Sequence, residues 1–308
     1  MLKPTARASH PASSSARVGG SVPGREQVIA ATREGFPVLD GVSSFLRGAK
    51  CLLDYRDHLA RKPEPVSARL PPAAVASWRA KLAGGTKLEE NDAMKLLRDF
   101  NLPANPGRIV ESESAACTAA RDVGYPVVLK TAARGIDHKS DRDGVRLNIQ
   151  NEAALTTAYR DLSSRIDPRV LLAPMVGAPG VEMLLGMVHD EQFGPVVLLG
   201  FGGVHVEALA DVVYALPPFD AAEARRLVDR LRLRALLGSK RHKRPPAVEQ
   251  FCETAAGFSA LVAELRDAVS EIDLNPVIVH GDGCVIVDAL IVSRQSHNLS
   301  EPKVREAI

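Results

Sequence analysis

The stretch YPVVLKTAARGIDHKSDRDGV, residues 125–145, joins a short apolar strand to a polar loop that contains glycine. The apolar run ends on Lys130, whose stem can stay packed while its ammonium reaches an anionic ligand. The loop that follows contains His138, Ser140 and Gly144, and loops of this kind surround phosphates with backbone N–H groups and small side chains. His138 is the loop residue that can accept a phosphoryl group on nitrogen. Each residue also has a simpler interpretation when it is considered alone. Lys130 can be a strand-end lysine whose ammonium reaches water, and His138 can be an exposed loop histidine.

Short strands and helices alternate on both sides of residues 125–145, which argues for an α/β or α+β domain. The helix predicted over 112–123 stops at Gly124, a favourable residue for ending a helix. Asp220 and Glu223 form a capping box, which predicts the start of another helix. The other elements that we predict are helices over 27–34, 42–59, 91–100, 220–237 and 248–265, and strands over 36–39, 108–110, 125–129, 170–176, 181–188, 195–200, 277–280 and 284–292.

The last two predicted strands form a hairpin around the turn Gly281-Asp282-Gly283. With a two-residue turn, Asn275 lies opposite Asp288. A three-residue loop instead places Pro276 opposite Asp288, so the spacing leaves the common face of the two side chains open. A carboxylate and an amide oxygen are ligands that Mg²⁺ takes when phosphates and waters fill its other positions, and Asp273 is a third oxygen nearby. A polar hairpin edge is the alternative.

A glycine cluster, Gly200-Phe201-Gly202-Gly203, follows another apolar strand. Tight turns require glycine for ordinary backbone reasons, so the cluster alone is a weak signal for a ligand. Glu207 and Asp211 come shortly after it. We expect them either to face a cation or a ribose, or to be surface carboxylates.

The composition of the 308-residue chain, with 45% hydrophobic and 25% charged residues, is typical of a soluble globular protein. Lys and Arg number 39 against 37 Asp and Glu, so a net charge of +2 predicts no strongly charged partner. The basic run 240–244 indicates a solvated helix face, because one Trp and four Tyr offer little stacking surface for nucleic acid. No apolar run approaches the ~20 residues needed to span a bilayer. We predict a cytoplasmic protein that binds neither nucleic acid nor membrane.

Two further features concern the ends and the cysteines. The four cysteines are scattered without metal-ligand spacing, which predicts reduced and mostly buried thiols. Residues 1–25 are basic, rich in Ser and free of acid, which predicts a disordered tail, with an organelle transit peptide as the alternative. The Pro-rich stretch that begins near residue 62 predicts a linker.

Six motifs then occur in the order and spacing of one family. Together they resemble the ATP-grasp half of the ADP-forming acetyl-CoA synthetases, with the succinyl-CoA synthetase β subunit as a more distant relative. The resemblance covers residues 86–293 and implies an ATP-grasp fold of two subdomains. The motifs are YPVVLK (125–130), HKSD (138–141), GVEMLLG (180–186), FGPVVLLGFGG (193–203), VEALAD (206–211) and EIDLNP (271–276).

The resemblance implies a role for each candidate residue. His138 matches the histidine that, in this family, takes a phosphoryl group from a histidine on the CoA-binding half and passes it to ADP. Asn275 and Asp288 would hold Mg²⁺. Lys130 would hold the phosphates of ATP, Glu182 would line the nucleotide pocket, and Gly202 and Gly203 would approach the phosphates or the relay loop. The other residues that we expect at ATP or ADP are Ser140, Gly144 and Glu207.

Residues 26–62 resemble the end of the CoA-binding half that precedes the ATP-grasp domain in fused members. We expect the rest of that half to be a CoA-binding, α-like subunit or domain on another chain, and a homo- or hetero-oligomer fits this view. The resemblance does not indicate which acid is the substrate. The predicted organisation is a tail (1–25), this remnant (26–62), a linker (63–85), the ATP-grasp domain (86–293) and a C-terminal tail (294–308).

Three departures from the family pattern support an alternative function. Asp143-Gly144 stands where two glycines are usual, so a carboxylate lies beside incoming phosphates. Ala215 stands where arginine is common, and the segment 238–246 is stretched. The leading hypothesis is a phosphoryl-transferring ATP-grasp component of an acid–CoA ligase (ADP-forming). The alternative is a non-catalytic nucleotide-binding or regulatory module left from a truncated fused synthetase.

Overall fold

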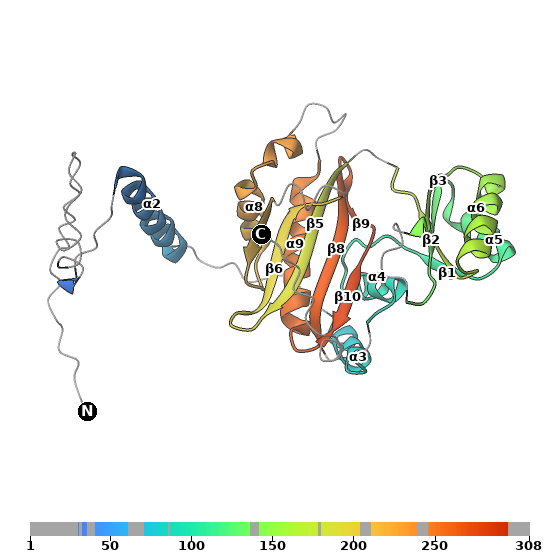
Figure 1. The fold of residues 1–308 in the computed structure, drawn as a ribbon, viewed down its shortest axis with the longest axis horizontal. Helices are drawn as coiled ribbons and strands as arrows, with labels where there is room; N and C mark the ends of the chain where they lie inside the picture. Colours follow the sequence, from blue (N-terminus) through green and yellow to red (C-terminus); the bar gives the residue numbers. More distant parts are fainter. Residues whose placement is uncertain are drawn as a thin grey trace. The chain divides into compact units, whose positions relative to one another are not determined.

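A computed structural model describes residues 30, 33–35, 41–60, 71–85, 87–135, 142–177, 180–203, 211–238 and 246–294, in two units, Met1–Pro63 and Glu64–Ile308 (Figure 1). The first unit contains helix α2 (Gly41–Ala60), which confirms the helix predicted over 42–59. The strand predicted over 36–39 and most of the helix predicted over 27–34 lie outside the described residues.

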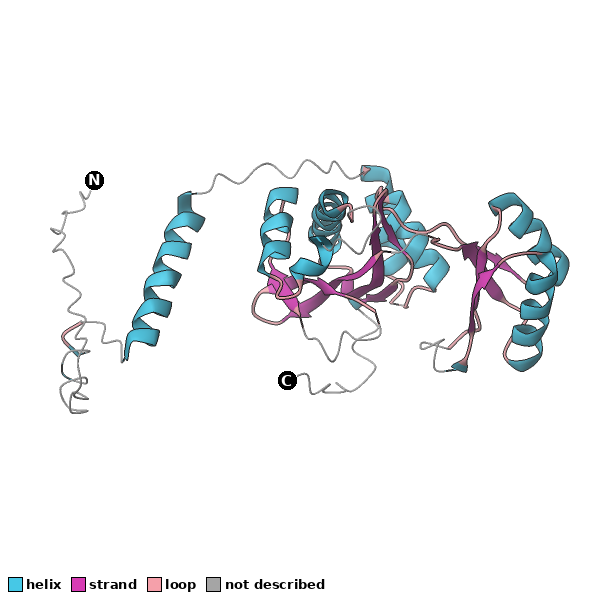
Figure 2. Cartoon of the chain, turned by 90° about the horizontal axis from the view of Figure 1, so that it is seen from above, coloured by secondary structure: helices cyan, strands magenta, loops and turns pink. Residues whose placement is uncertain are grey.

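A four-stranded sheet with the order β1-β4-β2-β3 occupies the first part of the second unit. Its neighbouring strands are antiparallel. Helices α5 and α6 pack on one face of this sheet, as Figure 2 shows, around a core that includes Ala116, Leu155 and Leu162. The elements are β1 (Arg108–Val110), α5 (Glu113–Val123), β2 (Val127–Thr131), β3 (Val145–Ile149), α6 (Glu152–Arg165) and β4 (Val170–Pro174).

A larger sheet of six strands follows, with the order β10-β8-β5-β6-β7 and with β9 paired to β8. Helices α8 and α9 pack against it, and α3 and α4 contribute to the same core. The elements are α3 (Pro72–Leu82), α4 (Glu90–Asp99), β5 (Val181–Asp190), β6 (Gly194–Phe201), β7 (Val212–Ala215), α8 (Ala221–Arg230), the 3₁₀ helix η2 (Arg234–Gly238), α9 (Val248–Leu265), β8 (Val269–His280), β9 (Gly283–Ile286) and β10 (Leu290–Ser293).

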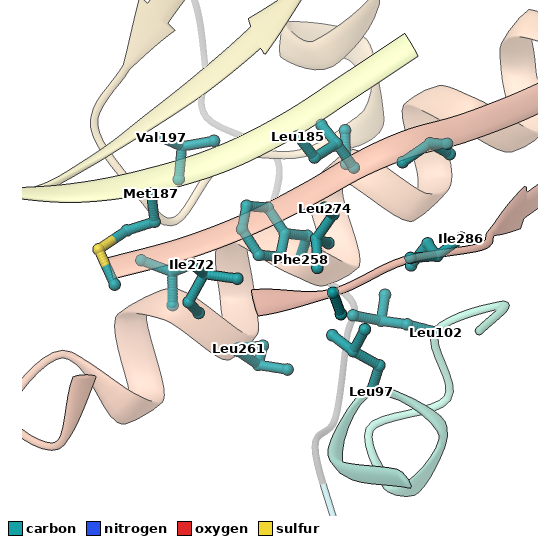
Figure 3. Close-up of a cluster of buried hydrophobic side chains, with 14 of the residues drawn as sticks. Leu97, Leu102, Leu185, Met187, Val197, Phe258, Leu261, Ile272, Leu274 and Ile286 are labelled. Carbon is teal, nitrogen blue, oxygen red and sulfur yellow. The ribbon is translucent and has the colours of Figure 1, made fainter. Parts of the chain in front are cut away.

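The core of the larger sheet lies between its strands and helix α9. Phe258 and Leu261 of α9 lie beside Ile272 and Leu274 of β8 (Figure 3), and all four side chains are at most 1% exposed. Along β8 the buried residues alternate with more exposed ones, as a sheet with one covered face requires. Glu271, Asp273 and Asn275 therefore project from the face of β8 that α9 does not cover.

The two antiparallel sheets make the fold α+β, and the predicted class is confirmed by this architecture. Helix α9 has the predicted bounds, and the side chain of Asp220 caps α8 by accepting from the backbone N–H of Glu223 at 2.6 Å. Helix α8 ends at Arg230, seven residues before the predicted end. The hairpin is also interrupted, because residues 287–289 separate β9 from β10.

Helix α3 lies within the stretch that we predicted as a linker. The prolines of that stretch suggested an irregular chain, but Pro72 is the first residue of the helix, where proline is well tolerated. Val75, Trp78 and Leu82 of α3 are buried in the larger core. The indole N–H of Trp78 donates to Asp99 at 2.9 Å, which ties α3 to α4.

Candidate nucleotide-binding site

Lys130 lies where the two sheets of the second unit meet. Its Nζ atom donates to Oε1 of Glu90 at 2.8 Å, to the carbonyl oxygen of Val287 at 2.9 Å and to Oδ2 of Asp288 at 3.3 Å. The first oxygen comes from the first turn of α4, and the other two come from the link between β9 and β10. Lys130 belongs to the smaller sheet, and the oxygen atoms around its ammonium come from α4 and from the β9–β10 link, which pack with the larger sheet.

The ammonium of Lys130 stays charged in this setting. Burial by itself would lower its pKa, but the carboxylates of Asp288 and Glu90 outweigh burial and raise the pKa of Lys130 above its ordinary value. The lysine side chain is 12% exposed, the Glu90 side chain 8% and the Asp288 side chain 44%. A charged and mostly buried lysine beside the more exposed Asp288 carboxylate is well placed to meet an anion that enters from that side.

Glu90 is a site residue that the sequence analysis did not identify. It is the first residue of α4 and looks like an ordinary acidic residue in the first turn of an amphipathic helix. Its contact with Lys130 joins residues 40 positions apart. No local pattern predicts such a contact, so only the tertiary fold could show it.

Asn275 and Asp288 occupy facing positions on the two arms of the closing hairpin. His280 pairs with Gly283 across the turn, which is the register of a two-residue turn. The same register continues from Val277 and Ile286 to Asp273 and Leu290, on either side of the link 287–289. Asn275 therefore stands opposite Asp288, and the alternative pairing of Pro276 with Asp288 is excluded.

A β-bulge sets the position of Asn275. Met183 pairs with Val277 and Leu185 pairs with Leu274, so Asn275 and Pro276 together oppose one residue of β5. Bulges of this kind redirect side chains and are frequent beside active sites. Here the bulge points the amide of Asn275 toward the loop that follows β6.

Gly202 and Gly203 bring this loop against Glu182 and Asn275. The backbone N–H of Gly203 donates to Oδ1 of Asn275 at 3.0 Å, and the N–H of Gly202 donates to the carbonyl oxygen of Glu182 at 2.8 Å. Gly203 has φ +83°, and a Cβ atom there would overlap the Glu182 carboxylate. Four predicted site residues are thus neighbours in space, and the positive φ at position 203 favours glycine there.

Gly144 is the predicted nucleotide-site residue of the phosphate loop that falls within the described part of the chain. Its carbonyl oxygen accepts from the N–H of Thr131 at 2.7 Å, so the end of the loop lies beside the strand that carries Lys130. The predictions for His138 and Ser140 (136–141), for Glu207 (204–210) and for the stretched basic segment (239–245) lie outside the described residues.

Asp143 does not present a free carboxylate to an incoming phosphate. Arg146 donates to its two carboxylate oxygens at 2.8 and 2.9 Å, and Arg165 approaches at 3.3 Å. Asp161 completes this cluster of two arginines and two aspartates. The hydrogen bond from Arg146 holds the pKa of Asp143 below its ordinary value. The negative charge that we expected beside the phosphates is therefore compensated by neighbouring guanidinium groups.

Asp211 has a structural role, which corrects both alternatives proposed for it. The residue is buried, and its carboxylate accepts from the backbone N–H groups of Arg232 at 3.0 Å and Leu233 at 2.8 Å. These bonds fix the turn after α8 and explain why that helix ends at Arg230. Burial alone would raise the pKa of Asp211, but the two backbone donors hold it below its ordinary value.

The amide of Asn275 and the carboxylate of Asp288 offer the ligand types that suit a magnesium ion also held by a nucleotide. Among the described residues, no group of three or more His, Cys, Asp and Glu is arranged to hold a metal ion. An amide and one carboxylate are a sparse set, which suits Mg²⁺ because it keeps waters and phosphate oxygens as its other ligands. The ammonium of Lys130 already stands as a cation beside Asp288.

Comparison with known proteins gives the family of the chain. A family model described as an ATP-grasp domain matches residues 79–292. The chain belongs to the ATP-grasp family. The β subunit of acetate–CoA ligase (ADP-forming) II from Pyrococcus furiosus is 33% identical to this ATP-grasp chain over 219 residues, which are 68% of the chain and 92% of the subunit. The predicted relation to ADP-forming acetyl-CoA ligases is confirmed.

Two further relatives of the ATP-grasp chain are a longer ligase and a protein of known structure. The 4-hydroxybutyrate–CoA ligase (ADP-forming) of Nitrosopumilus maritimus is 33% identical over 66% of this chain but only 30% of its own length. The acetyl-CoA synthetase 1 of Ca. Korarchaeum cryptofilum, solved with coenzyme A and Mg-AMPPCP, is 32% identical, with a TM-score of 0.62 over 71% of this chain and 98% of that one. Its phosphohistidine segment points towards the nucleotide binding site.

The structure also shows the environment of the four cysteines and the character of the described helices. Cys252 and Cys284 are buried, Cys117 is half-buried and Cys51 is exposed, and all four thiols are free. Burial raises the pKa of Cys252 to about 12, so that thiol is unreactive. In the part of the chain that the structure describes, no helix has both the length and the apolar character of a membrane span.

Proposed function

We propose that this chain is the nucleotide-binding and phosphoryl-transferring component of an ADP-forming acyl-CoA ligase. The observation that carries the proposal is the meeting of Lys130 with Asp288, opposite Asn275 and next to the Gly203 loop. A phosphate-binding cation and two magnesium-type oxygens in one place suit a Mg-nucleotide. A nucleotide site at this position agrees with the ATP-grasp family of the chain.

The described residues of the proposed site have separate roles in binding the nucleotide. Lys130 supplies a charged ammonium for the nucleotide phosphates, and its partly buried position strengthens the attraction. Asn275 and Asp288 hold Mg²⁺, which supplies charge neutralisation at the phosphates when it is bound. Gly202 and Gly203 let the backbone approach the phosphates closely, and Glu182 lines the pocket beside them.

His138 is the proposed phosphoryl acceptor. A neutral imidazole has a lone pair on one ring nitrogen, and that nitrogen can attack the γ-phosphorus of ATP. The bond from that phosphorus to the bridging oxygen breaks, and ADP leaves with the electron pair. Transfer of this kind depends mainly on positioning and charge neutralisation, which Lys130 contributes. In the reverse direction ADP accepts the group from His138.

A CoA-binding α-like subunit or domain completes the proposed reaction. The P. furiosus relative is a β subunit, and this chain matches only 30% of the length of the 4-hydroxybutyrate–CoA ligase of N. maritimus. The acyl and CoA sites would lie on that partner, and the acid substrate would be selected there.

The test uses the purified chain, γ-³²P-labelled Mg-ATP and the CoA-binding half of a related ligase. We expect Mg-ATP binding by calorimetry and an acid-labile, alkali-stable label on the protein that is lost in His138→Ala. The matched control is His189→Ala, at a histidine of β5 outside the loop, which should keep the label.

Two results separate the proposal from its rival. Binding of Mg-ATP without any acid-labile label in the presence of the partner would leave a nucleotide-binding regulatory module. Absence of both binding and label would remove the nucleotide site altogether.

A further inference from the structure

Three oxygen atoms surround the ammonium of Lys130 in the way that oxygen ligands surround a metal cation. Oε1 of Glu90, the carbonyl oxygen of Val287 and Oδ2 of Asp288 lie 2.8, 2.9 and 3.3 Å from Nζ. Two carboxylates and a carbonyl are typical ligands of divalent cations in proteins. We call these three groups the Lys130 cage.

The two carboxylates of the cage differ in their access to water. The Glu90 side chain is 8% exposed and the Asp288 side chain is 44% exposed. Two carboxylates so close together would repel each other if no cation stood between them, and the repulsion is strongest where water is excluded. Glu90 therefore anchors the ammonium from the buried side, and Asp288 meets it from the open side.

The cage overlaps the proposed magnesium site, because Asp288 belongs to both. A divalent ion that binds Asp288 without a nucleotide would place its charge next to the lysine ammonium, and no anion would offset the repulsion. A Mg-nucleotide brings phosphate charge that interacts with both cations. The same lysine thus opposes free metal and favours metal that arrives with phosphates.

We propose that Lys130 is a tethered cation that excludes free divalent metal from Asp288 until a nucleotide binds, and that Glu90 is the residue that positions it. The inference rests on the proposed nucleotide site and adds the order in which metal and nucleotide bind there. Metal and nucleotide enter together, and metal does not enter first. Glu90 acts through Lys130 and does not touch the nucleotide.

The test measures Mn²⁺ binding to the full chain without nucleotide, by the loss of the free-ion electron paramagnetic resonance signal. Wild type should bind Mn²⁺ weakly. Lys130→Met should bind it at least about tenfold more tightly, since the carboxylates of Glu90 and Asp288 then face each other without a cation. Lys130→Arg, which keeps the charge, should behave as wild type. The matched control is Lys95→Met on α4, which removes an exposed lysine paired with Asp99.

The double variant Lys130→Met/Asp288→Asn should lose the gained affinity. Equal Mn²⁺ affinity in wild type and a folded Lys130→Met, or an equal gain in Lys95→Met, would overturn the proposal. If Lys130→Met does not fold, Asp288→Asn decides the question. Its weak Mn²⁺ binding should equal that of wild type because the lysine already occupies Asp288, and a clear loss would show that free metal reaches Asp288.

The proposed function is tested separately by Mg-ATP calorimetry on wild type. If wild type binds Mg-ATP but Lys130→Met gains no Mn²⁺, the cage proposal fails and the nucleotide site stands. If wild type does not bind Mg-ATP, the proposed function fails, and a gain of Mn²⁺ in Lys130→Met still supports exclusion of metal by the lysine.

Discussion

The ammonium nitrogen of Lys130 lies 3.3 Å from Oδ2 of Asp288, although the two residues are 158 positions apart. Lys130 belongs to β2 of the four-stranded sheet, and Asp288 follows β9 of the larger sheet. The residue proposed to hold phosphates therefore touches a residue proposed to hold magnesium. Nucleotide affinity and the magnesium dependence of binding should therefore be coupled through this contact. Substitution of Lys130 alone and of Asp288 alone distinguishes the two effects.

Lys130→Ala should weaken Mg-ATP binding about tenfold or more, a loss on the order of 1.4 kcal/mol. The variant removes a partly buried ammonium whose attraction to phosphate is stronger than that of an exposed lysine. Calorimetric titration of the purified variant measures the effect. Lys95→Ala, at an exposed lysine of α4, serves as the control and should leave the affinity unchanged. Equal affinity in Lys130→Ala and wild type would remove Lys130 from the site.

Asp288→Ala should abolish the magnesium dependence of ATP binding while the fold remains intact. The carboxylate is 44% exposed and lies between β9 and β10, so its loss removes no residue of a strand. ATP titrations with and without Mg²⁺, together with circular dichroism, measure both properties. Asp267→Ala, at an exposed aspartate after α9, is the control. A wild-type response to magnesium in Asp288→Ala would show that the metal site has been placed wrongly.

Gly203→Ala should weaken ATP binding as well as stability. Gly203 has φ +83°, which costs a non-glycine residue about 1–2 kcal/mol, and the added methyl would also displace the Glu182 carboxylate. Gly194→Ala is a matched control, because Gly194 has φ +75° and open space where its Cβ would lie. Both variants should lose similar stability in urea unfolding. If Gly194→Ala reduces ATP affinity as much as Gly203→Ala does, the displacement of Glu182 is not the cause.

Elements that depend on local sequence were predictable. The apolar spacing of Val248–Leu265 and the cap formed by Asp220 are properties of neighbouring residues, and the structure has α9 and the start of α8 as predicted. The closing hairpin was predictable, but the sequence left two registers open, and the two-residue turn before Gly283 in the structure selects the one that faces Asn275 with Asp288. Four of the six family motifs, at 125–130, 180–186, 193–203 and 271–276, overlap the described strands β2, β5, β6 and β8.

Features that depend on distant residues were not predictable. Helix α8 ends early because Asp211, from another segment, binds the backbone of Arg232 and Leu233. Glu90 became a site residue only through its contact with Lys130. Asp143 lies in a typical loop sequence. It pairs with Arg165, which lies 22 positions away at the end of α6.

Asp211→Asn should destabilise the protein by about 1–3 kcal/mol at pH 7, since the buried carboxylate accepts from two backbone N–H groups and the amide can serve only one in the same way. The pKa of Asp211 is lower in the folded protein than its ordinary value of 3.8. Its charge therefore stabilises the fold above that value, and the stabilisation is lost as pH falls through the folded pKa. Urea unfolding from pH 7 to pH 3 should show a smaller loss of stability in Asp211→Asn than in wild type. Asp267→Asn, at an exposed site, should follow wild type, and equal pH slopes in all three proteins would contradict the assigned bonds.

Asp143→Asn should raise the labelling of His138 only moderately, and the increase should depend on salt. Asp143 is paired with Arg146 and Arg165, so its loss changes the charge of the cluster with Asp161 from neutral to +1. Because the cluster is largely exposed, this change acts on a phosphoryl group through water and is screened within about 10 Å at 0.1 M salt. Arg165→Ala changes the cluster charge in the opposite direction and should lower the labelling rate. Initial rates with γ-³²P-labelled ATP and the CoA-binding half, at 0.1 M and 1 M KCl, measure both variants, and their difference should shrink at high salt. A large rise in Asp143→Asn that persists at 1 M KCl would mean that the Asp143 carboxylate repels the phosphoryl group directly, despite its two arginines.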